Sequence, residues 1–397
     1  MSVTNLYKLA QKKEKYVAGL MSGTSVDGIS AALVKITGSG TATELKFIGG
    51  IEHSFPKGMR EKILSLAEPG GGSTAEICRM NFFIAYAYSE AIKKLSSSTG
   101  VPLRRIDLIG THGQTIHHLP AREKAYGFRS GSTLQIGDIA VIAKNLGITT
   151  IGDFRTADVA LGGEGAPFVP YFDYIILSSD KTNRALLNIG GIANITVLKK
   201  NVKPAGVIAF DTGPGNMLID ALMQRLYDKK FDRNGAVAFK GKVNNALLQK
   251  MIDSDTYINR VPPKSTGREF YSHEFVGFIL KNSKNVPAQD IITTVTFYTA
   301  WTVFYSYKEF IFNKVKISEL YVSGGGSKNR ALLAFLRSLF EASVIIENVK
   351  TIGVDSDYKE AICFAVLANE TLSGNPANLP SVTGASKQTI LGKICLP

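Results

Sequence analysis

The 397-residue sequence predicts an α/β protein in which one fold occurs twice, as two domains around a central cleft. The first observation is a repeated order of predicted elements, β-β-β-α-β-α-β, in the two halves of the chain. The second is a pair of glycine-containing hairpins at equivalent places, GLMSGTSVDGIS and LLNIGGIANIT. The third is that glycines gather just after apolar, β-branched runs, where they let a ligand approach backbone N–H groups.

The first half opens on a predicted hairpin. Residues 16–21 and 29–36 read as strands, and a turn rich in Gly, Ser, Thr and Asp joins them. Residues 45–53 predict a third strand. Apolar residues at helical spacing, with few breakers, predict a helix over residues 74–96. The half continues with a strand at 106–110, a helix at 136–145 and a strand at 148–152.

The same order then returns. Residues 184–189 and 194–198 predict a second hairpin around Gly190 and Gly191, and residues 207–210 predict its third strand. The remaining elements are strands at 319–322 and 343–346 and helices at 216–227, 244–252, 291–313, 327–341 and 358–372. We therefore expect one lobe from residues 1–157 and 358–397, closed by the last helix, and a second lobe from residues 158–357.

Composition narrows the functional class. The chain carries 46 Lys and Arg against 33 Asp and Glu, a net charge of +13. The basic residues are spread along the chain, with one small cluster at Lys12, Lys13 and Lys15, and no basic patch is interleaved with aromatic residues. A small phosphorylated ligand suits this charge as well as a polymer does. We expect no nucleic-acid partner.

The sequence also indicates the cellular compartment of the protein. No apolar run reaches the length of a membrane span, and residues 1–16 lack the apolar segment of a signal peptide. The three cysteines, Cys78, Cys363 and Cys395, form no metal or disulfide pattern, which favours a reducing compartment. We expect a cytoplasmic protein without membrane contact. The absence of GxxxxGK[ST], GxGxxG, GxSxG and HExxH disfavours P-loop, Rossmann, α/β-hydrolase and zincin chemistry.

The first candidate motif is MSGTSVDGIS, residues 21–30. Its hydroxyl side chains and its two glycines suit a hairpin tip whose N–H groups cradle polyphosphate. Asp27 offers a carboxylate that can hold Mg²⁺ through water. The alternative is a plain hairpin turn that Asp27 stabilises.

The second motif is FDTGPGN, residues 210–216. Asp211 ends an apolar strand, and a Gly-Pro-Gly turn leads from it directly into a helix. A carboxylate at a strand end facing a cleft suits a general base. The helix N-terminus that follows suits an anion. In the alternative, Asp211 only caps the turn.

The third motif is VSGGGSKN, residues 322–329. Three consecutive glycines between a strand and a helix leave no side chains in the way of a flat ring or a phosphate. The alternative is a tight strand-to-helix turn, which rarely needs three glycines.

Three further motifs offer polar side chains. In GTHGQTIHH, residues 110–118, His112 and Gln114 suit hydrogen bonds to sugar hydroxyls. The alternative is a polar turn. A zinc site is disfavoured because no cysteine or acidic cluster completes a ligand set. In residues 152–170, Arg155 suits a ligand carboxylate or phosphate, or else an Arg–Asp pair that pins an interdomain segment. KSTGRE, residues 264–269, is either an anion-binding loop or a solvated turn.

Together and in this order, the motifs resemble the anhydro-N-acetylmuramic acid kinase family. The matching segments span about residue 17 to 392: MSGTSVDG, GTHGQTI, DFR…D…GG.GAP.VP, LNIGGIANIT, FDTGPGN, PPKSTGRE, SGGG and Glu360. Each segment is weak alone, but the ordered set is specific. The family shares the duplicated, ribonuclease H-like fold of acetate and sugar kinases, Hsp70 and actin, which agrees with the two halves inferred above.

The resemblance implies ATP-dependent phosphorylation of 1,6-anhydro-N-acetylmuramic acid. Water opens the 1,6-anhydro bridge, the freed O6 receives the γ-phosphoryl group, and the product is N-acetylmuramic acid 6-phosphate, a step in recycling cell-wall peptidoglycan. Asp211 is implied as the base that activates the water. ATP and Mg²⁺ are the implied cofactors, and a homodimer is the implied assembly.

The resemblance also implies the binding residues, with Asp27 directed toward Mg²⁺. The first hairpin would bind ATP phosphates through Gly23, Thr24, Ser25, Val26, Asp27, Gly28, Ile29 and Ser30. The second half would bind the nucleotide through Gly190, Gly191, Asn194, Gly213, Gly215, Asn216, Gly324, Gly325 and Gly326. Sugar contacts would come from His112, Gln114, Arg155, Asp158 and Glu360.

The chain departs from the family pattern at several positions. Ser30 stands where the family usually carries an acidic residue, Glu164 replaces a usual Gln, and Asp173 lies where His is common. Residues 123–133 look like an insertion near the sugar-side loop. These differences keep a levoglucosan kinase open as an alternative. An actin- or Hsp70-like ATP-binding module without sugar chemistry is a second alternative, and it would not need GTHGQT or KSTGRE.

Overall fold

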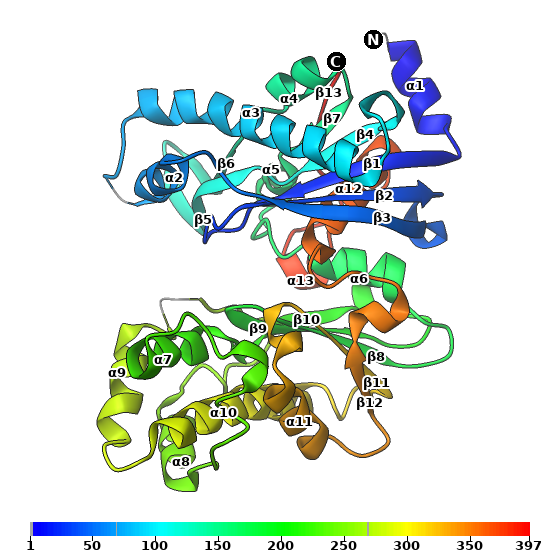
Figure 1. Ribbon diagram of the computed structural model, residues 1–397. Helices are drawn as coiled ribbons and strands as arrows, with labels where there is room; N and C mark the ends of the chain where they lie inside the picture. The colour runs from blue at the N-terminus through cyan, green and yellow to red at the C-terminus, as the bar shows by residue number, and fades with distance from the viewer. Residues whose placement is uncertain (1–2, 69, 268–269) are drawn as a thin grey trace. The chain divides into compact units, whose positions relative to one another are not determined.

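The computed structural model describes residues 3–68, 70–267 and 270–397, which form two compact units (Figure 1). Unit 1 extends to Leu177 and resumes from Gly353 to Pro397, and unit 2 is Ser178–Ile352. The expected lobe boundary after residue 157 is therefore corrected: residues 158–177 belong to the first unit. The return to unit 1 also comes slightly before the expected residue 358.

Unit 1 is built on a six-stranded sheet in the order β13-β7-β4-β1-β2-β3. Its strands are β1 (Glu14–Met21), β2 (Ile29–Thr37), β3 (Glu44–His53), β4 (Leu108–Thr111), β7 (Thr150–Gly152) and β13 (Lys393–Cys395). Its helices are α1 (Val3–Gln11), α2 (Met59–Ala67), α3 (Thr74–Thr99), α4 (Ile139–Leu146), α5 (Phe154–Ala160), α6 (Val169–Leu177), α12 (Lys359–Leu372) and α13 (Pro380–Thr383).

Buried polar contacts explain why residues 158–177 belong to unit 1. Tyr171 on α6 donates a hydrogen bond to Glu370 at 2.9 Å. Asp173 forms an ion pair with Lys359, with 2.7 Å between Oδ1 and Nζ and both side chains buried. Glu370 and Lys359 are both on α12, and breaking a buried ion pair leaves a charge without compensation. Helix α6 is therefore fixed to the helix that closes unit 1.

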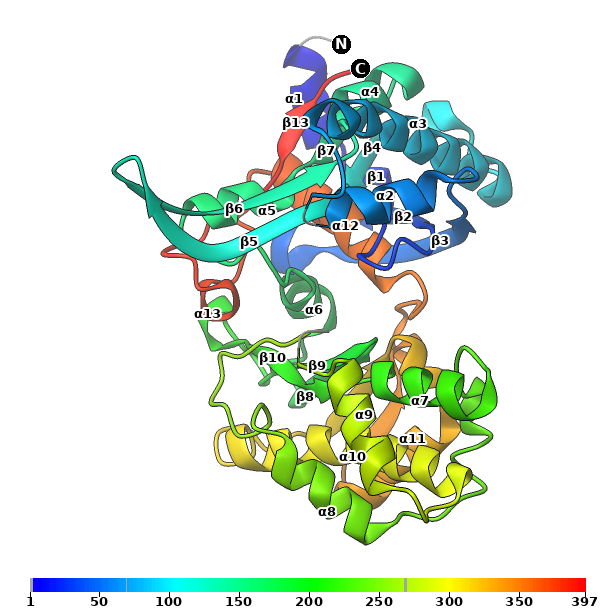
Figure 2. The same cartoon turned by 90° about the vertical axis from the view of Figure 1, so that its left-hand side faces the viewer.

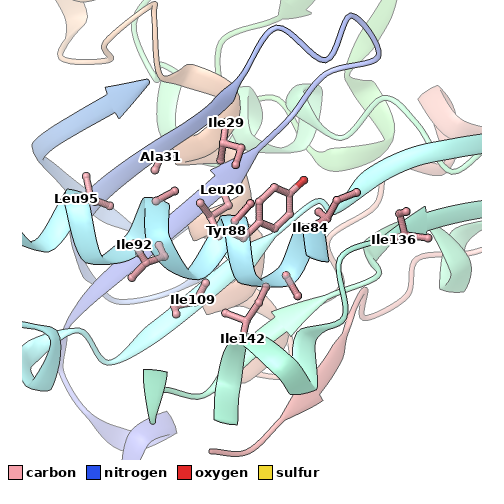
Figure 3. Close-up of a cluster of buried hydrophobic side chains, with 14 of the residues drawn as sticks. Leu20, Ile29, Ala31, Ile84, Tyr88, Ile92, Leu95, Ile109, Ile136 and Ile142 are labelled. Carbon is pink, nitrogen blue, oxygen red and sulfur yellow. The ribbon is translucent and has the colours of Figure 1, made fainter. Parts of the chain in front are cut away.

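Helix α3 covers one face of the sheet. A Ser73 capping box begins this helix, which gives an N-terminus that the sequence pattern predicts well. Tyr88, Ile84 and Ile92 on its inner side pack against Leu20 and Ile29 of the hairpin strands (Figure 3). Because successive strand residues point to opposite faces, this apolar row fixes which hairpin residues turn away from α3.

Helix α12 covers the opposite face, and two glycines allow it to lie close. Gly19 on β1 and Gly110 on β4 are register partners. A Cβ at Gly19 would overlap the carbonyl oxygen of Ala361, and a Cβ at Gly110 would overlap that of Phe364. The helix backbone thus rests directly on the two strands.

Strands β5 (Gln114–Ala125) and β6 (Phe128–Ile136) form a separate two-stranded sheet. Figure 2 shows it as a long curved hairpin that extends away from the main sheet of unit 1. The expected insertion at residues 123–133 is the tip of this hairpin. The tip exposes Tyr126 and Phe128.

Unit 2 repeats the architecture with a five-stranded sheet in the order β10-β9-β8-β11-β12. The strands are β8 (Arg184–Ile189), β9 (Ile192–Leu198), β10 (Ile208–Pro214), β11 (Glu319–Ser323) and β12 (Ile345–Asn348). Helices α10 (Ala288–Phe310) and α11 (Arg330–Leu339) share a core with the sheet. A second core joins α10 to α7 (Met217–Tyr227), α8 (Asn245–Ser254) and α9 (His273–Asn282).

The strand orders confirm the predicted duplicated α/β fold. In each unit the first three strands are antiparallel, and the next two add in parallel on the side of the first strand. The order is β3-β2-β1-β4-β7 in unit 1 and β10-β9-β8-β11-β12 in unit 2. Among the helices of the described residues, none is both long and apolar enough to cross a membrane.

The close approach of α12 gives a stability prediction. Replacing Gly110 by Ala should destabilise the protein by about 1–3 kcal/mol, because the new methyl group forces α12 away from β4. Gly277→Ala is the control: no atom lies within 4 Å of its Cβ position on α9, and Ala favours a helix. The thermal unfolding midpoints of both variants, compared with that of the native protein, test this prediction. An unchanged midpoint for Gly110→Ala would contradict this packing.

Candidate active site

The hairpin tip between β1 and β2 carries the first set of predicted nucleotide residues. Val26 and Ile29 are 2% and 0% exposed, so they anchor the tip in the core. Between these anchors, Thr24 and Asp27 expose their side chains. The Arg60 guanidinium lies 3.3 Å from Asp27 Oδ1. A metal ion bound at Asp27 would therefore compete with a neighbouring cation.

Gly23 in this tip is not required by the protein's own packing. It has no left-handed conformation, and a Cβ there would meet only Ser25 Oγ at 4.0 Å. Gly28 is tighter, since its Cβ would lie 3.2 Å from the His53 carbonyl oxygen. Ser30 Oγ donates to Glu52 Oε1 at 2.7 Å. Open space at Gly23 is what the approach of a ligand to backbone N–H groups needs.

Gln114 lies inside the protein rather than at a surface that contacts sugar. Its side chain is 0% exposed. Ser22 Oγ donates to Gln114 Oε1 at 2.7 Å, and Gln114 Nε2 donates to the Gly23 carbonyl at 3.2 Å. The amide thus ties β5 to the hairpin tip, and a direct contact of Gln114 with the sugar stays a prediction.

His112 and Arg155 form a pair. His112 Nδ1 lies 2.8 Å from the Gly113 carbonyl oxygen, and Arg155 Nε donates to His112 Nε2 at 3.0 Å. The ring is therefore neutral, with its proton on Nδ1. Burial and the Arg155 charge lower the pKa of His112 to about 3. Burial lowers the pKa of Arg155 to about 10, opposed by Glu360, so the guanidinium stays charged at neutral pH.

Glu360 and Asp158, two predicted sugar contacts, differ in accessibility. Glu360 lies in the first turn of α12 and is exposed. Its pKa is raised by partial loss of hydration, against the nearby charges of Lys359 and Arg155. Asp158 is 0% exposed and accepts hydrogen bonds from Asn378 at 2.7 Å, Thr383 at 2.8 Å and the Gly165 N–H at 2.8 Å. These bonds give Asp158 a structural role in unit 1, and its contact with a sugar stays a prediction.

In unit 2 the β8–β9 hairpin is hydrogen-bonded to the start of α7. Asn216 N donates to the Gly190 carbonyl at 2.8 Å, and Gly215 N and Met217 N donate to the Gly191 carbonyl at 2.8 and 3.2 Å. These N–H groups are not free for an anion, which corrects the expectation for this helix start. A Cβ at Gly190 or Gly191 would fit without a clash, because the nearest atoms would lie at 3.7 and 3.8 Å, in ordinary van der Waals contact.

The three consecutive glycines after β11 have separate causes. Gly324 has a left-handed φ of 77° and begins the 3₁₀ turn Gly325–Lys328. A Cβ at Gly326 would overlap the Ile189 side chain. Gly325 would meet only Asn216 Nδ2, at 3.4 Å. One glycine of the three therefore leaves backbone open to a ligand, and two serve the turn.

A polar row crosses the unit 2 sheet and includes Asp211. The pairing register places Asp211 beside Asn194, Asn194 beside Asn188, and Asn188 beside Ser323. The adjacent row, Phe210, Ile195, Leu187 and Val322, lies in the core with α10 and α11. The polar row therefore faces away from these helices. Sequence reasoning missed Asn188 and Ser323, although a lone Asn in the apolar run LLNIGG was a signal.

Asp211 is held at a β-bulge, where the register shifts before Gly213. The Thr266 N–H donates to Asp211 Oδ2 at 2.9 Å, and the Asp211 N–H donates to the Lys264 carbonyl at 3.2 Å. Tyr257 Oη donates to the Asp211 carbonyl at 2.9 Å. These bonds connect the KSTGRE segment to the predicted base. Arg268 and Glu269 of that segment lie outside the described residues.

The Lys264 side chain lies beneath this segment. Its Nζ donates to the Ile258 carbonyl at 2.8 Å and lies 4.8 and 4.7 Å from the ring centroids of Tyr257 and Phe310. Loss of hydration lowers the pKa of Lys264 to about 8, opposed by Asp255 and Asp211. Lys264 thus supports the loop that fixes Asp211, and its ammonium is not extended into solvent.

Comparison with known proteins decides the family. Residues 15–397 match the description of the anhydro-N-acetylmuramic acid kinase family. The chain belongs to that family. An anhydro-N-acetylmuramic acid kinase of Caldanaerobacter subterraneus subsp. tengcongensis is 43% identical over 395 residues, 98% of this chain and 99% of the relative. The anhydro-N-acetylmuramic acid kinase of Clostridioides difficile is 42% identical over 380 residues, which are 96% of this chain and 98% of the relative. That of Bacillus cereus strain AH187 is 43% identical over 383 residues, which are 96% of this chain and 99% of the relative.

The neutral His112 gives a pH prediction. Its folded pKa of about 3 lies below its ordinary value of 6.5, so the unfolded chain binds the extra proton first as the pH falls. Folding stability from this group is present above pH 6.5 and declines toward pH 3. Between pH 8 and pH 5 the decline is about 2 kcal/mol, and His112→Gln removes it. Urea unfolding of both proteins at each pH tests this, and parallel pH curves would contradict a neutral buried imidazole.

Proposed function

We propose that this enzyme catalyses the ATP-dependent hydrolytic ring opening and 6-O-phosphorylation of 1,6-anhydro-N-acetylmuramic acid, in the recycling of peptidoglycan. Family membership supports a kinase. The observation that carries the specific chemistry is Asp211, a carboxylate fixed at a strand-end bulge on the polar face of the unit 2 sheet.

Asp211 acts as the general base. Its Oδ2 accepts the Thr266 N–H, which fixes the orientation of the carboxylate. The carboxylate takes a proton from a water molecule as the water oxygen bonds to C1 of the sugar. The C1–O6 bond breaks, and O6 bonds to the γ-phosphorus as ADP leaves. A positioned base of this kind typically contributes about 10²–10⁴ in rate.

The open glycines are the residues that fit ATP. Gly23, Gly190, Gly191 and Gly325 each have space where a side chain would stand. Backbone N–H groups in such turns suit phosphate oxygens or a nucleotide ring. Asn216 supports this arrangement by donating from Nδ2 to the Ile189 carbonyl at 3.2 Å. Gly213, Gly215, Gly324 and Gly326 shape the turns that carry the open positions.

Mg²⁺ would have few protein ligands. No group of three or more His, Cys, Asp or Glu side chains is arranged for a metal in the residues that the structure describes. Asp27 is exposed and suits a contact through water. When bound with ATP, Mg²⁺ would neutralise charge on the phosphates.

The sugar is bound from unit 1 by Arg155 and Glu360, with His112 positioning Arg155. The Arg155 guanidinium gives one N–H to a neutral ring, and its other N–H groups make no hydrogen bond within the described residues. They suit the lactyl carboxylate of the substrate. Of the departures from the family, Asp173 is buried in its ion pair with Lys359, so it does not bear on sugar choice.

We also propose that the protein is a homodimer in the cytoplasm. A homodimer follows from the family resemblance, and light scattering of the purified protein would test it. Cytoplasmic location rests on the composition and on the substrate, a product of cell-wall turnover.

The base proposal gives a kinetic prediction. Asp211→Asn keeps the shape and removes the basicity, so kcat should fall by about 10²–10⁴ while ATP and sugar still bind. Asp228→Asn, an exposed carboxylate at the end of α7, is the matched control and should retain normal kcat. Steady-state kinetics with binding measured by calorimetry separates the two effects. Near-normal kcat in Asp211→Asn would remove Asp211 from this role.

Substrate choice is tested with two sugars that share the anhydro bridge. 1,6-Anhydro-N-acetylmuramic acid should exceed levoglucosan in kcat/KM by up to about 10⁴–10⁵, because the smaller sugar leaves the Arg155 guanidinium without a carboxylate partner. The methyl ester of the lactyl carboxylate is the matched control, because it keeps the sugar's shape and removes the negative charge that Arg155 would contact. Equal kcat/KM values for the two sugars would leave only the broader assignment of an anhydrosugar kinase.

A further inference from the structure

A basic recess lies in unit 1 away from the residues described above. It has a volume of about 460 Å³, within the usual range for small-molecule sites. It is formed by the start of β1 and by the 3₁₀ turn Leu103–Arg105 before β4. The lining residues are Lys12, Lys13, Glu14, Tyr16, Arg104, Arg105 and Asp107.

The two carboxylates of the recess are already paired. Asp107 accepts from Lys12 Nζ at 2.7 Å and from the Tyr16 N–H at 2.9 Å. Glu14 is paired with Lys35, at 2.7 Å between Oε2 and Nζ. These acidic groups are therefore not available to neutralise the other cations of the recess.

Three lining cations remain without an acidic partner in the part of the chain that the structure describes: Lys13, Arg104 and Arg105. All three are exposed. Arg105 lies over the Tyr16 ring, 5.5 Å from its centroid, which restricts the guanidinium. Because Lys12 neutralises Asp107 and Lys35 neutralises Glu14, the charges of Lys13, Arg104 and Arg105 are not offset within the lining.

The recess is distinct from the nucleotide hairpin. It lies at the first residues of β1, whereas the hairpin tip follows the last. Strand β1 has eight residues, which at about 3.3 Å each separates the two ends by about 26 Å. A ligand in the recess cannot be the ATP that the hairpin tip contacts.

We propose that this recess binds a small phosphorylated metabolite through its phosphate dianion. A phosphate monoester carries about two negative charges, which suit the three cations that have no acidic partner here. Adjacent arginines offer forked N–H donors that match phosphate oxygens. The volume exceeds what a phosphate alone fills, so the rest of the metabolite lies beside Tyr16. This site does not depend on the proposed kinase reaction.

The test uses inorganic pyrophosphate as the probe, with the full-length protein saturated by a non-hydrolysable ATP analogue. Calorimetry compares the native protein with Arg104→Ala/Arg105→Ala and with Lys199→Ala/Lys200→Ala. The control removes the same charge from exposed lysines of unit 2. We expect binding about tenfold or more weaker in the arginine variant, unchanged binding in the control, and unchanged kcat and KM for ATP in both.

Equal binding in all three proteins, or equal weakening in both variants, would overturn the proposal. Tighter binding of a short DNA duplex than of pyrophosphate, lost in the arginine variant, would overturn it in favour of a polymer. Lys13→Ala supplies a second variant if the double substitution lowers the thermal unfolding midpoint. A failed kinase proposal would appear as absent activity in all three proteins, with the difference in pyrophosphate binding intact.

Discussion

The direct contact of helix α12 with strands β1 and β4 is the constraint on which unit 1 depends. It exists because Gly19 and Gly110, side by side in the sheet, present no side chain to the helix backbone. Once α12 is placed, its two ends fix other parts of the unit. Glu360 is presented in its first turn, and near its end Glu370 accepts the Gly40 N–H at 2.9 Å and the Tyr171 hydroxyl at 2.9 Å. A helix that is distant in sequence thus positions these parts of unit 1.

The sequence predicted the strands, most helices and the duplication because those signals are local. Alternation, helical spacing and glycine turns are determined within a few residues, and each unit shows them in the same order. The β5–β6 hairpin was not predicted because its polar strands lack an apolar face. The boundary between the units was not predicted because it depends on the contacts of Tyr171 and Asp173 with residues of α12. The buried hydrogen bonds of Gln114 and Asp158 were not predicted, since the sequence shows that a residue is polar but not that partners from distant segments enclose it.

Glycine clusters at strand ends combine two physical causes that the sequence does not separate. After β11, Gly324 is required by its backbone conformation and Gly326 by the nearby Ile189 side chain. Gly325 between them is required by neither. The same division holds at the β8–β9 hairpin. Gly215 must be small because of the Gly190 carbonyl, whereas a Cβ at Gly190 itself would fit without a clash. The positions without such a cause are the informative ones, because neither packing nor backbone conformation requires glycine there.

The partner of a cation determines what that cation can still do. Lys359 faces Asp173 at 2.7 Å and Arg184 faces Glu319 at 2.5 Å, so carboxylates neutralise both, and their role is to hold segments together. Arg155 instead donates to the neutral imidazole of His112. A neutral acceptor fixes the direction of the guanidinium without cancelling its charge. Burial strengthens this effect, because it keeps His112 unprotonated and prevents repulsion between two cations. The pairing with His112 thus fixes the direction of the Arg155 guanidinium and leaves it charged beside Glu360.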